Sequence, residues 1–219
     1  APGVDFDRTY VRVGAVYPYR FDGSGWVEQS RIDLPDFAGS RSFFGSSIAL
    51  GGSTAVVTGV RVAGFSRRAA LVYEFDGTSW ARTAVLQASD AADRWDLRDS
   101  ADVSGDQIIR RGFRTPTGER ATSAAYVFAK NGSDWEEVQK LEADVSETSH
   151  STGAPYFDIY DVALVGNTAV LSGQAGTVTT AGGTFSGGAA VVFENDGQRE
   201  NGTVHKRPPA ASPMEPILS

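Results

Sequence analysis

Hydrophobic residues recur along the chain in short runs of strand length, and glycine-rich turns separate the runs. In three places an apolar run reaches an Asp-Gly or Asn-Gly turn or its equivalent and the next run opens with a tryptophan, at 19–26, 73–80 and 128–135. Such turns need positive φ, which glycine and asparagine tolerate, so each segment predicts a β-hairpin. A fourth copy at 191–197 lacks the tryptophan; the other three are 54 and 55 positions apart, at Trp26, Trp80 and Trp135.

A second motif lies between these hairpins, at 47–59, 102–112 and 161–173. Each copy consists of a short strand, a tight turn containing glycine, and an apolar strand that ends in glycine. One repeat therefore holds four strands, and a serial repeat of four antiparallel strands is typical of β-propeller blades. No window keeps a 3.6-residue period over ten residues, which excludes a helical solenoid.

The predicted fold class is therefore all-β, a β-propeller of four-stranded antiparallel blades over residues 1–197. The blades are predicted as a partial unit at 8–36, two full units at 43–95 and 96–156, and a partial unit at 157–197. The length of 219 residues allows either a compact propeller of about four blades or an open partial propeller. An open arc would expose unpaired strand edges, which favour self-assembly.

The expected inner strands of the blades are rich in small residues, as at 47–50 and 163–165, because strands crowd together near a central axis. The outer strands carry bulk, and we interpret the three repeated tryptophans as packing between neighbouring blades, with a sugar-stacking platform as the alternative. Two segments are expected to lack strands. Residues 177–188 are predicted as a long glycine- and threonine-rich loop, and 198–219 as a flexible proline-rich tail.

Several of these motifs resemble those of a known family. They are Phe44-Gly45, Ser104-Gly105-Asp106, and the run 124–128 that leads to Trp135. Over residues 10–197 the chain resembles the FG-GAP repeats of integrin-α-like β-propellers. The resemblance implies an extracellular or cell-surface propeller. Many family members carry a calcium loop of the form Asp-x-Asp-x-Asp-Gly, which is missing here, so the resemblance does not carry calcium binding over to this chain.

Charge and composition argue against several classes of function for this protein. The net charge is −7 and the isoelectric point is near 4.9, which argues against nucleic-acid binding because a phosphate backbone requires a basic face. The sequence has no cysteine, so disulfides, thiol catalysis and thiolate metal sites are excluded. No stretch approaches 18 apolar residues, so insertion into a membrane is not expected.

The densest run of carboxylates contains Asp90, Asp93, Asp96 and Asp99. The first three are weak metal candidates, because their spacing of three differs from that of a calcium loop; a solvated loop between blades, with no cofactor, is the favoured interpretation. His150 and His205 lie in polar stretches without partner ligands, so no catalytic residue is assigned. Two segments match the glycan acceptor pattern, at Asn131 and Asn201.

We therefore expect a non-enzymatic interaction or structural module, extracellular or at the cell surface, that binds a protein or matrix partner. In such scaffolds the loops at the blade tips bind the partner, so we predict that the segments 182–188 and 90–99 form the binding surface. The candidate binding residues are Trp95, Gly182, Gly183 and Phe185. The alternative is a carbohydrate-binding propeller with a glycan partner, for which Trp95 is the candidate exposed aromatic. A third hypothesis is an enzyme with its site at the central channel.

Overall fold

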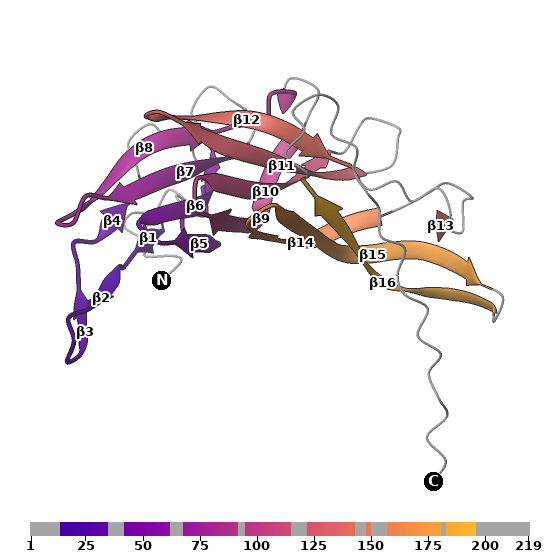
Figure 1. Ribbon diagram of the computed structural model, residues 1–219, viewed down its shortest axis with the longest axis horizontal. Helices are drawn as coiled ribbons and strands as arrows, with labels where there is room; N and C mark the ends of the chain where they lie inside the picture. The colour runs from indigo at the N-terminus through magenta and orange to yellow at the C-terminus, as the bar shows by residue number, and fades with distance from the viewer. Residues whose placement is uncertain are drawn as a thin grey trace, which may run out of the picture.

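The structure is a computed structural model that describes residues 14–34, 42–61, 68–91, 95–114, 122–142, 148–149, 157–180 and 183–195. These residues form strands and turns, with no α-helix among them, which confirms the all-β prediction. All strand pairs are antiparallel. Three sheets follow one another along the chain, and a pair of two-stranded ribbons precedes them (Figure 1).

In the first two sheets the strands run in chain order from one edge to the other. The first sheet consists of β5 (Ile48–Gly51), β6 (Thr54–Arg61), β7 (Arg68–Phe75) and β8 (Trp80–Leu86). The second consists of β9 (Trp95–Ser104), β10 (Gln107–Arg114), β11 (Thr122–Asn131) and β12 (Asp134–Leu141). The third contains β14 (Phe157–Val165), β15 (Thr168–Thr180) and β16 (Gly183–Glu194), with β13 (Thr148–Ser149) paired to the far part of β15. The N-terminal unit comprises β1 (Ala15–Val16), β2 (Tyr19–Phe21), β3 (Trp26–Glu28) and β4 (Ile32–Asp33).

The same turn joins the first two strands of every sheet. Gly52, Gly105 and Gly166 have φ values of 60°, 57° and 54°. A side chain is disfavoured at such angles, so glycine at these positions permits the tight connection from β5 to β6 and its two equivalents. The repeated glycine of the sequence motif thus sets the hairpin register.

A second repeated glycine lies within the second strand of a sheet, at Gly59 in β6 and Gly173 in β15. A Cβ atom built at Gly173 would lie 2.0 Å from the backbone oxygen of Asp158, and one built at Gly59 would lie 2.0 Å from that of Phe43. Neither distance is compatible with a side chain. These two glycines are therefore required by the close approach of the neighbouring backbone.

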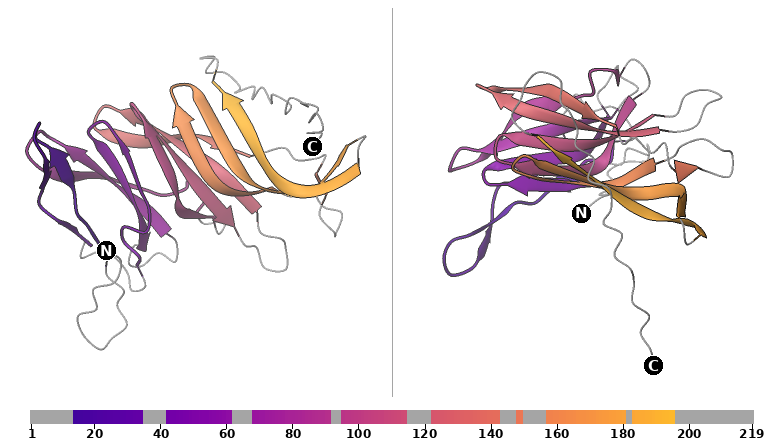
Figure 2. Two further views of the ribbon diagram at one scale, coloured as in Figure 1. Left: turned by 90° about the horizontal axis from the view of Figure 1, so that it is seen from below. Right: turned by 45° about the vertical axis from the view of Figure 1, so that its right-hand side comes forward.

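The sheets stack face to face in a curved row, with β5, β9 and β14 side by side along one edge (Figures 1 and 2). At this edge a Cβ atom at Gly51 would lie 2.8 Å from Val103 Cγ1 of the next sheet. Close contact between first strands explains why small residues occur there.

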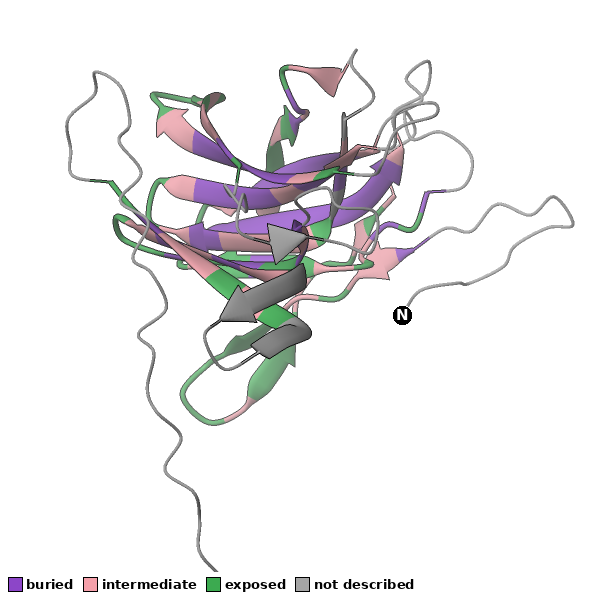
Figure 3. Cartoon of the chain, turned by 90° about the vertical axis from the view of Figure 1, so that its right-hand side faces the viewer, coloured by how far each residue is buried: buried purple, intermediate pink, exposed green. Residues whose placement is uncertain are grey.

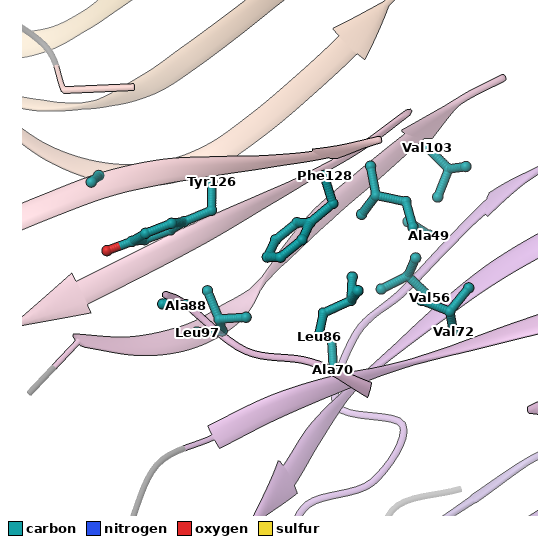
Figure 4. Packing of buried hydrophobic residues seen from close by; sticks show 12 residues of the cluster. Ala49, Val56, Ala70, Val72, Leu86, Ala88, Leu97, Val103, Tyr126 and Phe128 are labelled. Carbon is teal, nitrogen blue, oxygen red and sulfur yellow. The ribbon is translucent and has the colours of Figure 1, made fainter. Parts of the chain in front are cut away.

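Three apolar clusters fill the spaces between successive sheets. We call the face of a sheet that packs on the following sheet its leading face, and the opposite face its trailing face. In the first sheet the leading face presents Ala49, Val56, Ala70 and Val72, and the trailing face presents Ala55, Val57, Leu71 and Tyr73. The leading face of the first sheet meets the trailing face of the second, where Phe128 lies over Leu86 and Tyr126 lies over Ala88 and Leu97 (Figure 4). Similar clusters join the second sheet to the third and the N-terminal unit to the first.

The structure corrects two predictions of loops. Most of the segment 177–188 is strand, because β15 continues to Thr180 and β16 begins at Gly183, with these two residues paired. Threonine and valine at 177–180 have high β propensity, and three of their four cross-strand partners, Ser186, Phe185 and Thr184, are not glycine. Asp96 and Asp99 were predicted in a loop between blades but lie within β9.

Candidate functional site

Carboxylates at equivalent positions of two sheets link each of these sheets to the one before it. Asp96, near the start of β9, accepts a hydrogen bond from the backbone N–H of Arg68, where β7 begins. Asp158, near the start of β14, accepts hydrogen bonds from Arg111 Nη2 at 3.0 Å and Ser123 Oγ at 2.6 Å. Ser123 lies near the start of β11, the strand equivalent to β7. These carboxylates therefore join the first strand of one sheet to the third strand of the preceding sheet.

Asp90 links the connection after β8 to the second sheet. It accepts hydrogen bonds from Tyr126 Oη at 2.8 Å and from Lys140 Nζ at 2.9 Å. Burial and the carboxylate of Asp90 raise the pKa of Tyr126 well above its usual range. Burial alone would lower the pKa of Lys140, but hydrogen bonds to Asp90 and Glu142 outweigh it and raise this pKa. The group is a charge-assisted contact between sheets.

Further polar contacts hold the outer parts of the first and second sheets together. Glu74 Oε1 lies 2.8 Å from Lys130 Nζ and accepts a hydrogen bond from Trp135 Nε1 at 3.3 Å. Glu137 accepts hydrogen bonds from the backbone N–H and the hydroxyl of Ser89, both at 2.8 Å. Side chains of the second sheet thus contact both β7 of the first sheet and the connection that follows β8.

Arg110 is fully buried in the trailing face of the second sheet. Burial lowers the pKa of its guanidinium to about 10, although Asp99 and Asp96 oppose this shift. The equivalent positions in the first and third sheets hold Val57 and Leu171, which are also fully buried. A charged side chain therefore occupies a position that is aliphatic in the other two sheets.

The metal candidates do not gather into a site within the described part of the chain. No three histidine, cysteine, aspartate or glutamate side chains there are placed to hold an ion. Asp90 is paired with Lys140, and Asp96 is bonded to Arg68. Asp93 lies outside the described residues.

The candidate binding residues fall at the start of β9 and at the tip of the β15–β16 hairpin. The backbones of Trp95 and Phe185 are paired in the sheets with Arg114 and Val178, and their side chains lie outside the description. Gly183 pairs with Thr180, whereas Gly182 lies outside the described residues, as do His150, His205 and Asn201. Asn131 is exposed at the end of β11, and its amide nitrogen donates to Glu136 Oε2 at 3.3 Å.

The antiparallel order places the chain connections on two opposite rims. The tight-turn rim carries the short turns after β2, β5, β7, β9, β11 and β14. The opposite rim is defined by the strand ends Arg61, Leu86, Arg114, Leu141 and Thr180, and we call it the long-loop rim. Both candidate segments, the one that follows Leu86 and the hairpin tip after Thr180, belong to the long-loop rim.

The repeated tryptophans differ in exposure according to what lies next to them. Trp80 and Trp135 are half-buried and pack against the clusters on the trailing faces of their sheets, as predicted. Trp26 is 72% exposed, so the packing predicted for it is wrong. No described strand lies against the trailing face of the N-terminal unit, which leaves this indole in solvent.

The sequence reasoning missed Asp158 and Glu74. The strand registers show that Asp158 occupies the position in the third sheet that Asp96 occupies in the second.

Comparison with known proteins adds no family assignment. No protein-family model matches the chain, and no curated protein shows significant similarity to it. In the described part of the chain, no helix is long and apolar enough to span a membrane.

Proposed function

We propose that the chain is an open arc of β-propeller blades of the FG-GAP type that acts as a non-enzymatic interaction module, outside the cell or at its surface. The observation that carries the proposal is the stack of successive antiparallel sheets with β5, β9 and β14 together along one edge. Blades around a propeller axis have this arrangement. The sequence resemblance to FG-GAP repeats supports the same architecture.

The ionisable groups at the interfaces between sheets form hydrogen bonds and ion pairs that join one sheet to the next. Asp90 accepts a hydrogen bond from the second sheet, which follows it in the chain. Asp96 and Asp158 each accept a hydrogen bond from the sheet that precedes their own. Arg68, Arg111 and Lys140 supply the opposite charges. Carboxylates with such partners hold the scaffold rigid, and a rigid scaffold positions loops for binding. This use of charge supports a scaffold role over a catalytic one.

The long-loop rim is the proposed binding surface, and its partner is a protein or a matrix polymer. The segment after Leu86 and the β15–β16 hairpin tip both leave this rim. The tight-turn rim instead carries short turns fixed by glycine or by aspartate side chains, as at Asp22 and Asp76. On such folds the rigid sheets usually position the loops, and the loops bind the partner.

The test replaces rim residues while keeping the links between sheets. A variant with Ala92, Asp93 and Arg94 changed to Gly-Ser-Gly, and with Gly182 and Gly183 changed to serine, leaves Asp90 and Asp96 intact. The control carries Ser133→Gly and Thr78→Gly on the tight-turn rim. Binding to a panel of purified extracellular-matrix proteins is measured by interferometry. We expect the control to bind like the unchanged chain and the rim variant to bind at least tenfold more weakly; equal binding by both variants refutes the proposed surface.

A carbohydrate-binding role is the second candidate, and one observation favours it. The rings of Phe21 and Trp26 lie 5.7 Å apart on the exposed β2–β3 hairpin, and Tyr19 on the same hairpin is 52% exposed. Exposed aromatic rings stack on sugars. A glycan array that gives hits with the unchanged chain and none with Trp26→Ala supports this role, and an array without hits removes it.

A further inference from the structure

The leading face of the third sheet is apolar and no described strand covers it. Val72 and Val127 occupy equivalent leading-face positions of the first and second sheets and are 0% and 8% exposed. Their equivalent in the third sheet is Val192, which is only half-buried. Val170 is likewise half-buried, although its equivalent Val56 is fully buried. Figure 3 views the molecule from this end.

The trailing face of the N-terminal unit is exposed in the same way at the other end of the arc. Tyr19 is 52% exposed, whereas its equivalents Tyr73 and Phe128 are 5% and 2% exposed. Trp26 is exposed, whereas Trp80 and Trp135 are half-buried. The described part of the arc thus has aromatic side chains at one end and small aliphatic side chains at the other.

The two sheet–sheet interfaces and the junction with the N-terminal unit show what covers such faces. In the interface between the first and second sheets, the small leading-face residues Ala70 and Val72 pack against Tyr126 and Phe128 of the trailing face. A face of small apolar side chains therefore accepts an aromatic trailing face. The trailing face of the N-terminal unit is of this aromatic kind.

A polar contact of the same interface also has its counterparts at the two ends. Trp135 Nε1 donates to Glu74 Oε1 at 3.3 Å. By the strand registers, Glu194 is the third-sheet equivalent of Glu74, and Trp26 is the equivalent of Trp135. Glu194 and Trp26 are both exposed. One end therefore carries the donor, Trp26, and the other carries the acceptor, Glu194, of a hydrogen bond equivalent to the one between Trp135 and Glu74.

We propose that copies of this chain associate head to tail, with the leading face of the third sheet of one copy packed on the trailing face of the N-terminal unit of the next. The proposal rests on the blade architecture of the proposed function and names a second copy as a partner. In the complex, Trp26 donates to Glu194 of the partner subunit. Because the two surfaces differ, the contact is heterologous, so association continues to a ring or a filament.

Sedimentation velocity tests the proposal over a concentration series from about 1 to 200 μM, a range that covers weak contacts of this kind. Ala190→Asp blocks the leading face at an exposed position of β16, and Val192→Asp blocks it a second time. Trp26→Asp blocks the trailing face. Val138→Asp is the matched control, because Val138 is 57% exposed on β12, away from both faces. Circular dichroism checks the fold of each variant.

We expect the unchanged chain and the control to gain mass with concentration, and each blocked variant alone to associate at least tenfold more weakly. An equimolar mixture of Ala190→Asp and Trp26→Asp retains one good face of each kind, so it should form a one-to-one dimer and nothing larger. A monomeric unchanged chain at every concentration overturns the proposal. So does undiminished association of Trp26→Asp, which indicates a symmetric contact between two leading faces.

Matrix binding by the same variants separates this inference from the proposed function. If the unchanged chain is monomeric and still binds a matrix protein through the long-loop rim, only the head-to-tail contact is wrong. If it associates without binding any matrix protein, only the proposed binding function is wrong.

Discussion

Truncating one valine at three equivalent positions measures what the stacking of sheets contributes to stability. Val72 lies in the cluster between the first and second sheets, and Val127 in the cluster between the second and third. Val192 occupies the same position in the third sheet, with no described sheet beyond it. The substitution is chemically the same in each case, valine to alanine on the third strand of a sheet. Only the presence of a following sheet differs.

The expected cost follows from burial. Valine to alanine removes two carbon atoms, worth about 1.6 kcal/mol when fully buried, and the cavity left behind raises the loss at Val72 to about 2–3 kcal/mol. Val127 is 8% exposed, so its loss should be similar. Val192→Ala removes contacts on one side only, and we expect a loss below about 1 kcal/mol. For a domain of this length, a loss of about 2–3 kcal/mol lowers Tm by roughly 4–12 °C.

The assay is urea unfolding followed by circular dichroism, at a concentration where sedimentation shows a monomer. A shift in the midpoint without a change in slope reports a change in stability alone. Equal losses at Val72, Val127 and Val192 would refute the reasoning, because they would show that the leading faces are not distinguished by a following sheet. A larger loss at Val192 than at Val72 would refute it as well.

Three further predictions concern single contacts. Gly173→Ala should destabilise the third sheet by more than Gly166→Ala in urea unfolding, because its Cβ meets the Asp158 backbone oxygen whereas the turn position is open; the reverse order would contradict the account of the repeated glycine. Tyr126→Phe should lose about 1–2 kcal/mol by removing the hydroxyl that donates to Asp90, and an unchanged midpoint would show that this contact is not formed. Asp22 and Asp76 should titrate below the ordinary aspartate pKa of 3.8 in carbon-detected NMR, because backbone N–H groups of Ser24 and Ser79 bond their carboxylates. Since these pKa values are lowered in the folded state, the stabilisation is present above about pH 4 and is lost as pH falls through them; midpoints at or above 3.8 would exclude the turn hydrogen bonds.

The local elements were predictable because their signals are local. The Asp-Gly and Asn-Gly turns near Gly77 and Gly132 predicted the outer hairpins, and both glycines have positive φ. The small residues of the first strands predicted crowding, which the approach of Val103 to Gly51 confirms. The repeat of about 55 residues predicted four strands for each unit, and the first two sheets have four each.

The contacts between sheets were not predictable, since they depend on residues far apart in the sequence. Asp90 resembled part of a solvated acidic loop, but it bonds to Tyr126 and Lys140 of the next sheet. Trp26 carries the same motif as Trp80 and Trp135, and only the arrangement of neighbouring sheets explains its exposure. The hairpin of β15 and β16 extends through a glycine-rich segment because cross-strand pairing outweighs the local preference for a loop.

A cross-link between the first and second sheets tests the stacked arrangement most directly, and the absence of cysteine in the chain makes it clean. A Cβ atom at Gly51 would lie 3.0 Å from Val103 Cβ and 2.8 Å from the Val103 backbone oxygen, so the two strands must move apart by about 0.5 Å or more to reach the spacing of about 3.5–4.5 Å that a disulfide needs. The double variant Gly51→Cys and Val103→Cys should form an intramolecular disulfide on mild oxidation, seen by mass spectrometry as the loss of two hydrogens. The pair Gly25→Cys and Val103→Cys, whose first member has no atom within 4 Å of its Cβ, should not. A folded Gly51→Cys and Val103→Cys protein that keeps both thiols free would contradict the stacking of the sheets.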